Sequence, residues 1–289
     1  MPSVVLAGAT FHLGPWNPHV EVWLLVAVLA GGYAIAARRI GPWCVAPGQP
    51  TVTRRQAVCF ALALCTLWLA ADYPIHDVAE RSMYSVHMVQ HLLFSMVAAP
   101  LLLMGTPGWL ARWILRPPSL LFRLVRRLAR FFPAILVFNA VLVVTHWPSV
   151  VDASLRSGWL HFGLHAVILL SALIVWMPLL SPLPEVPRLS VPARMLFLFS
   201  QSIVPTVPAS FLTFGSSPLY KGYVGLPKLW GLSALEDQQT AGLIMKLAAG
   251  MMLWLLIAVM FFRWAREEER QQQPQVRRAL DRELTELGL

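Results

Sequence analysis

The chain has 289 residues, of which 57% are hydrophobic and only 13% are charged, and its mean hydropathy is +0.62. This composition excludes an ordinary soluble globular protein and predicts a membrane protein. The formal net charge is +9. We expect that charge to reflect membrane topology and contact with anionic membrane lipid, so no nucleic acid partner is needed to explain it.

Several apolar segments are long enough to be membrane-spanning helices, each of which needs about 20 residues. We expect about seven helices, at 20–37, 56–72, 83–104, 132–147, 158–180, 193–214 and 239–263. The fourth is the shortest, and the sixth should kink at Pro205 and Pro208, with the freed carbonyls against protein or water rather than lipid. The first residues lack the basic region of a cleavable signal peptide, so the first helix is expected to remain. The predicted fold class is an all-α polytopic membrane helix bundle.

The basic residues predict how the bundle is oriented. Most of the 23 lysine and arginine residues follow the odd-numbered helices, whereas the opposite loops hold only a few: Arg81, Arg156, Lys221 and Lys228. By the positive-inside rule, the N-terminus is outside and the C-terminus is cytoplasmic. Residues 1–263 are expected to form one transmembrane bundle. Residues 264–289 are expected to form a charged cytoplasmic tail, with a break at QQQPQ and a short helix after Pro274.

The histidines gather at the predicted outer end of the bundle. His12 and His19 precede the first helix, and His76 lies in an outer loop near Glu80, which is read as a solvated charge. The remaining five are at the outer ends of helices three, four and five: His87, His91, His146, His161 and His165. HMVQH and HFGLH each place two imidazoles on one helix face, and two such pairs can supply four ligands to one ion.

These five histidines are the predicted metal ligands, because ionisable groups inside a membrane usually face the bundle interior as functional sites. Helix packing through hydrogen bonds is the alternative explanation. Imidazole suits copper, zinc and iron, whereas thioether sulfur favours Cu(I), so nearby methionines favour copper. Additional candidate ligands are Met83, Met88, Met245, Asp237 and Gln238. Asp237 and Gln238 stand at a helix N-terminus, where a carboxylate also caps backbone amides.

Five segments of the sequence resemble the CtaG family of multi-spanning bacterial cytochrome c oxidase assembly factors. They are HMVQHLLFSMVAAPLLLMGTP from His87, THWP at 145–148, HFGLHAVILLSALIVWMPLLSP from His161, PLYKGY at 218–223 and DQQTAGLIM at 237–245. The resemblance covers roughly residues 70–265. It adds little for the first two helices or the tail.

The resemblance implies a non-enzymatic role in the bacterial inner membrane. Such a protein would help to mature a haem-copper oxidase by delivering or inserting copper on the extracytoplasmic side, with an oxidase subunit or a copper donor protein as partner. The family's signature histidines match the five histidines named above, and its helix-seven motif matches Asp237, Gln238 and Gly242. The chain departs from the family at Lys246, where an aromatic residue is common.

Three other classes of membrane protein fit part of this pattern. A b-type cytochrome uses histidines from two helices as haem ligands, although two imidazoles on one helix face suit a small ion better. A metal-dependent hydrolase needs a carboxylate base, and the histidine-bearing helices three and five contain none. A retinal protein would use Lys246, but helix three offers no carboxylate counter-ion.

Overall fold

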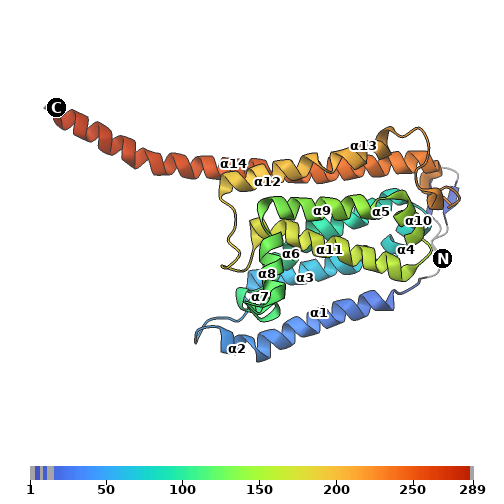
Figure 1. Ribbon diagram of the computed structural model, residues 1–289, viewed down its shortest axis with the longest axis horizontal. Coiled ribbons are helices and arrows are strands. Elements are labelled where there is room, and N and C mark those ends of the chain that lie inside the picture. Colours follow the sequence, from blue (N-terminus) through green and yellow to red (C-terminus); the bar gives the residue numbers. More distant parts are fainter. Residues whose placement is uncertain (1–3, 7–8, 12–15, 287–289) are drawn as a thin grey trace.

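A computed structural model of the chain is a bundle of long helices with one helix projecting beyond it (Figure 1). The structure describes residues 4–6, 9–11 and 16–286, and the side chains of residues 16–272. In this part of the chain, six helical units are long and apolar enough to cross a membrane. They are α1 (Val20–Arg39), α3 with α4 (Arg54–Ala71, Ile75–Arg81), α5 with η1 and α6 (Tyr84–Leu92, Leu93–Ala98, Ala99–Gly105), α11 (Gly158–Leu180), α12 with α13 (Val191–Ile203, Thr206–Phe214) and α14 (Ala234–Glu286).

A bent pair of helices is the candidate for a seventh span. The axes of α8 (Leu120–Leu128) and α9 (Phe131–Thr145) differ by 90°. With 15 residues, α9 is about 22 Å long, which is shorter than a hydrocarbon core of about 30 Å. The predicted fourth helix is therefore the shortest, as expected, and the predicted all-α bundle of about seven spans is confirmed.

The remaining elements are short. They comprise α2 (Gly41–Cys44), α7 (Gly108–Leu115), α10 (Pro148–Ser154), and the 3₁₀ turns η2 (Lys221–Tyr223) and η3 (Leu229–Gly231). Near the N-terminus, β1 (Val4–Leu6) and β2 (Ala9–Phe11) form an antiparallel pair in which Val4 is opposite Phe11. This hairpin was not predicted. It precedes the helical bundle, which contains the histidine pairs.

Local sequence signals account for several helix starts. Thr53 and Gln56 form a capping box at α3, in which the threonine hydroxyl accepts from the Gln56 amide and the glutamine side chain accepts from Thr53 N. Ser157 caps α11. Ser233 and Glu236 exchange the same reciprocal hydrogen bonds at the start of α14. Each of these caps satisfies amides that have no partner within their own helix.

Prolines interrupt one span but not the C-terminal helix. The predicted kink of the sixth span is confirmed, because α12 ends at Ile203 and α13 begins after Pro205. The predicted break at Pro274 is wrong, because α14 continues through it to Glu286. A proline removes one backbone hydrogen bond. The good helix formers on both sides of it, mainly Gln, Arg, Glu, Ala and Leu, outweigh that loss.

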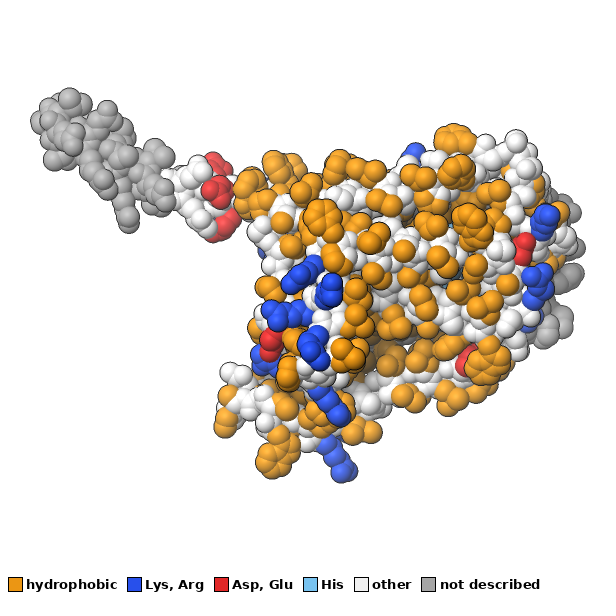
Figure 2. Space-filling model, viewed as in Figure 1, with side chains coloured by type: hydrophobic (Ala, Val, Ile, Leu, Met, Phe, Trp, Pro, Cys, Tyr) orange, Lys and Arg blue, Asp and Glu red, His pale blue; other side chains and the backbone are white. Residues whose placement is uncertain are grey.

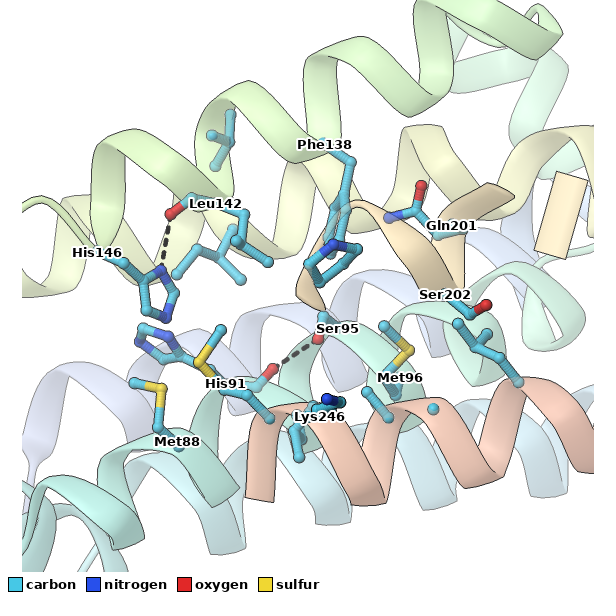
Figure 3. Close-up of a pocket in the computed structure, with 18 of the residues that line it drawn as sticks. Met88, His91, Ser95, Met96, Phe138, Leu142, His146, Gln201, Ser202 and Lys246 are labelled. Atoms are coloured by element: carbon cyan, nitrogen blue, oxygen red, sulfur yellow. Dashed lines mark hydrogen bonds between the residues drawn. The ribbon is translucent and has the colours of Figure 1, made fainter. Parts of the chain in front are cut away.

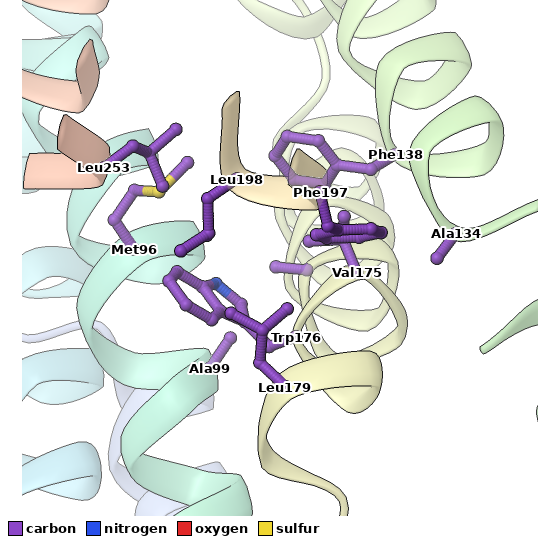
Figure 4. Close-up of a cluster of buried hydrophobic side chains, with 11 residues drawn as sticks. Met96, Ala99, Ala134, Phe138, Val175, Trp176, Leu179, Phe197, Leu198 and Leu253 are labelled. Atoms are coloured by element: carbon purple, nitrogen blue, oxygen red, sulfur yellow. The ribbon is translucent and has the colours of Figure 1, made fainter. Parts of the chain in front are cut away.

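The main apolar core lies between α6, α9, α11, α12 and α14 (Figure 4). Phe138, Trp176 and Phe197 are its large buried rings. The indole Nε1 of Trp176 donates to the carbonyl oxygen of Ser95 at 2.8 Å. Ser95 lies in η1, a π-helical turn inside the third span. The widened turn is therefore held by a side-chain donor from α11.

Charged residues occupy the two ends of the bundle, and the sides between them are largely apolar (Figure 2). The arginines of α7 and α8 lie at one end, and α4, α5 and α10 lie toward the other (Figure 1). This separation of basic residues from the histidine-bearing end is the distribution that the predicted orientation requires. The orientation of the termini stays a prediction.

Candidate metal centre

The two HxxxH pairs meet inside the bundle. Within each pair the ring centroids are close, at 4.3 Å for His87 and His91 on α5 and 4.2 Å for His161 and His165 on α11. Across the pairs, His91 and His165 are 5.1 Å apart and His87 and His161 are 5.2 Å apart. His161 is only 2% exposed, and His87 and His91 are also buried. The rings therefore point toward one another and away from lipid.

Three of these imidazoles are close enough to hold one ion. His87, His91 and His165 each offer a nitrogen, and these nitrogens all lie within 4.8 Å of one another. Around an ion with metal–nitrogen bonds of about 2 Å, such nitrogens would be roughly 3.3 Å apart. Small side-chain rotations close that difference. We call these three residues the imidazole triad.

His146, at the end of α9, lies beside the triad. Its ring centroid is 5.2 Å from that of His91, with the two rings edge to face, and Figure 3 shows them next to each other. Its Nδ1 lies 2.7 Å from the carbonyl oxygen of Leu142, so Nδ1 carries the proton and donates. The Nε2 atom is left buried without a hydrogen-bond partner. A lone pair in this state is available to a metal ion.

His161 lies against a carboxylate. Its Nδ1 is 2.9 Å from Oε1 of Glu80, which comes from α4. This is an ion-pair distance, and both ring nitrogens of His161 are buried without a hydrogen-bond partner. Metal-binding histidines characteristically donate their second nitrogen to a carboxylate or a backbone carbonyl. His146 shows the carbonyl arrangement, and His161 has the carboxylate of Glu80 within ion-pair distance of its Nδ1.

His76 joins the cluster but its nitrogens are otherwise used. Its ring centroid is 5.3 Å from that of His161, and His76, His161 and His165 also offer three nitrogens within 4.8 Å. However, the amide Nε2 of Gln90 donates to the Ala70 carbonyl at 2.7 Å and lies 3.0 Å from His76 Nδ1. The Nδ1 atom must therefore accept, and the proton sits on Nε2. This geometry favours the imidazole triad over the set that contains His76.

His76 and Glu80 were not predicted as members of the cluster. Both were expected in an outer loop, whereas the chain turns at 72–74 and forms α4, which brings them over His161. Both residues lie four apart in IHDVAER, the spacing that singled out the HxxxH pairs. His19 stacks edge-on against His76 at 4.4 Å, and its Nε2 contacts Asp77. His12 lies outside the described residues.

The unpartnered nitrogens are the most informative feature of the cluster. Among the described residues, buried ring nitrogens without a hydrogen-bond partner are Nδ1 of His87, Nε2 of His146 and His165, and both nitrogens of His91 and His161. Leaving a buried polar atom unpartnered costs about 1–3 kcal/mol. Several such atoms facing one another would be costly in an empty core. A bound cation would satisfy them together.

The predicted methionines divide into two groups. Met88 and Met245 line a cavity together with His91 and His146, and its empty volume, open space included, is about 680 Å³. The sulfur of Met83 instead accepts from the backbone amide of Leu229 at 3.4 Å. Met88 and Met245 are therefore the thioethers placed to take part in a site.

The predicted ligands Asp237 and Gln238 have their oxygens engaged with backbone amides. The two carboxylate oxygens of Asp237 accept from the amides of Tyr84 and Ser85, at 2.8 and 3.0 Å. The expected capping is present, but it acts on α5 rather than on α14. Oε1 of Gln238 accepts from the amide of Leu219. Asp237 therefore positions the helix that carries His87 and His91.

Two tyrosines of the PLYKGY segment hold other parts of the cluster in place. The Tyr220 hydroxyl donates to the carbonyl of His146 at 3.0 Å, and the Tyr223 hydroxyl donates to that of Ala79 in α4 at 2.8 Å. Burial raises the pKa of Tyr220 to about 12 and raises the pKa of Tyr223 well above its usual value. Both hydroxyls therefore remain protonated donors at physiological pH.

A hollow lies at the protein surface beside this cluster. Glu80 is part of its wall and also contacts His161. The other lining residues are mostly charged: Arg81, Asp152, Leu155, Arg156, Lys221, Gly222 and Leu226. Glu80 therefore connects the protein surface to the buried imidazoles.

Comparisons with known proteins give one result for this chain. The family model described as cytochrome c oxidase caa3 assembly factor (Caa3_CtaG) matches residues 31–267. This match extends beyond the recognised motifs and begins within α1. No curated protein and no solved structure gives a significant match.

Proposed function

We propose a copper-delivery role for this chain, which belongs to the cytochrome c oxidase caa3 assembly factor family. It binds copper at the extracytoplasmic end of its bundle and delivers it to the oxidase. The observation that carries the proposal is the convergence of two HxxxH pairs whose buried nitrogens lack partners. The protein acts as a non-catalytic factor in the bacterial inner membrane. Its partners are an oxidase subunit and a copper donor protein.

The ligand types support copper. The described cluster contains imidazoles and two nearby thioethers, and the cysteines Cys44, Cys59 and Cys65 lie elsewhere, in α2 and α3. Imidazole binds copper and zinc well, while thioether adds a preference for Cu(I). Structural zinc sites are usually built with cysteine thiolates. The combination of imidazole and thioether therefore favours copper over zinc.

The geometry argues against haem between the paired imidazoles. Two histidines on opposite sides of one iron place their ring centroids roughly 6 Å apart, with metal–nitrogen bonds of about 2 Å. Here His87 and His161 are 5.2 Å apart, and His91 is 5.1 Å from His165. A macrocycle needs a wider gap than these rings leave, whereas a single ion does not.

The surroundings of Glu80 and Lys246 argue against the two other classes. Glu80 contacts Nδ1 of His161, on the side of the ring opposite Nε2. Its carboxylate is therefore directed away from an ion on Nε2 and is poorly placed to activate a metal-bound water. Lys246 is exposed rather than enclosed as a retinal-binding lysine would be. A metal-delivery role fits both residues.

The proposal is tested by metal analysis of detergent-purified full-length protein loaded with Cu(I). We expect wild-type protein to retain copper and the combined His87→Ala, His91→Ala, His161→Ala and His165→Ala variant to lose it. His19→Ala, which changes a histidine outside the triad, is the control and should retain copper. Helicity and size-exclusion profiles establish that the variants are folded. Undiminished copper in the folded combined variant would refute the site.

The assembly role needs a cellular measurement. We expect a deletion strain to show reduced oxidase activity and reduced levels of assembled oxidase, and copper-site variants to restore neither. A plasmid copy of the wild-type protein should restore both. Normal oxidase in the deletion strain would contradict the role.

A further inference from the structure

We infer that the cluster offers copper two positions: the imidazole triad, and a second position at the head of the cavity formed by Met88, His91, His146 and Met245. This inference rests on the proposed copper function and adds a route through the site. The second position combines two imidazoles with two thioethers. Such a set suits Cu(I) in particular.

His146 is what separates the two positions. Among the described histidines, the only ring in contact with His146 is that of His91, at 5.2 Å, and His146 is in neither group of nitrogens within 4.8 Å. Its Nε2 is buried and unpartnered, while Nδ1 is fixed by the Leu142 carbonyl. The sequence predicted one pocket for all five histidines. The structure places His146 on the cavity side.

Two thioethers complete this second set. Met88 is 1% exposed and Met245 is 6% exposed, and both line the cavity with His91 and His146. Figure 3 shows Met88 beside the neighbouring rings of His91 and His146. Met88 and Met245 also belong to one buried cluster. The two thioether side chains therefore reach the same cavity as the two imidazoles from α5 and α14.

His91 is the ligand that the two positions share. Both of its ring nitrogens are buried without a partner, and its ring lies 5.1 Å from His165 on one side and 5.2 Å from His146 on the other. An ion on the triad can exchange His87 and His165 for His146 and the thioethers while it stays bound to His91. Ligands are exchanged and no electron is transferred.

The cavity extends away from the histidines. Beyond His91 and His146 its lining includes Ser95, Gln201, Ser202 and Thr206. It also includes Lys246, whose side chain is exposed. The cavity therefore reaches the side of the bundle between α14 and the break that separates α12 from α13. A membrane-spanning oxidase subunit could receive the ion at that side. The positive charge of Lys246 would shorten the residence of a cation there.

The test compares Cu(I) with Zn(II), because thioether binds Cu(I) much better than Zn(II). Full-length protein in detergent is loaded with either ion, affinities are measured by competition with a chromophoric chelator, and X-ray absorption reports the ligand atoms. For the wild type we expect sulfur as well as nitrogen around Cu(I), and nitrogen without sulfur around Zn(II). The Met88→Leu, Met245→Leu variant should lose the sulfur signal and at least about tenfold in Cu(I) affinity, with Zn(II) affinity within twofold of wild type.

Two further variants locate the positions separately. Met96→Leu changes another methionine in the same cavity and is the matched control, expected to alter neither ion. His87→Ala with His165→Ala should abolish Zn(II) binding and leave sulfur around Cu(I). Unchanged Zn(II) affinity also shows that the methionine variant is folded.

The results distinguish this inference from the function on which it rests. Wild-type protein that binds Cu(I) through nitrogen alone, with no effect of the methionine substitutions, would overturn the second position and leave the proposed function standing. Wild-type protein that binds no copper would overturn the proposed function itself.

Discussion

The contact between Glu80 and His161 gives a quantitative prediction. Glu80→Gln keeps the size of the side chain and removes its negative charge, so the carboxylate 2.9 Å from His161 Nδ1 is replaced by a neutral amide. Charge-assisted hydrogen bonds are roughly twice as strong as neutral ones. Loss of a partner of this kind typically lowers metal affinity by about 10–100-fold.

The exposure of Glu80 places the expected effect at the low end of that range. Its side chain is 25% exposed, so water partly screens the charge that His161 experiences. We therefore expect copper affinity to fall by about tenfold, equivalent to about 1.4 kcal/mol. Glu80→Asp keeps the charge and should lose less affinity than Glu80→Gln, although its shorter chain reaches His161 less well.

The assay is chelator competition with Cu(I) on purified protein, with Asp77→Asn as the matched control. Asp77 is on the same short helix, but its contacts are with His19 and Arg81 rather than with His161. The reasoning would be refuted if Glu80→Gln bound copper within twofold of wild type. Equal losses in Glu80→Gln and Asp77→Asn would also refute it, since they would indicate a general effect on α4.

Three other substitutions test the framework around the site. Gly242→Ala should lower the unfolding temperature in detergent, because the added Cβ would lie 2.5 Å from Thr213 Oγ1. Gly250→Ala, which has open space around it, should not lower that temperature. Equal effects of the two substitutions would contradict this prediction. Asp237→Asn should lower the free energy of unfolding by about 3–5 kcal/mol, because a buried carboxylate loses its charge beside Lys228. An unchanged free energy of unfolding would contradict this prediction. Lys246→Gln should slow Cu(I) release to a chelator in stopped-flow measurements, and an unchanged or faster rate would contradict the role of that charge.

The sequence could predict the histidine pairs because their spacing is local. Residues four apart share a helix face whatever the tertiary fold, and hydropathy gave the depth of His87 and His161 in the bundle. The charge distribution and the proline positions were equally local signals. The number of spans and the break near Pro205 followed from them.

Contacts between distant segments were beyond local patterns. Whether Asp237 caps its own helix or α5 depends on how α14 packs against α5, and nothing in LEDQQTAG specifies that neighbour. The contact of Glu80 with His161 requires the turn that folds α4 over the bundle. The separation of His146 from the other predicted ligands likewise depends on where α9 ends relative to α5.

The π-helical turn η1 has a consequence for the whole third span. An extra residue in one turn offsets the two halves of a helix by about 100° around their common axis. The half before Leu93 directs His87 and His91 at α11, and the half after Ala98 directs Ala99 into the apolar core. Removing one residue from this turn would restore an ordinary helix and rotate the two imidazoles off their partners, even though every ligand remained in the chain.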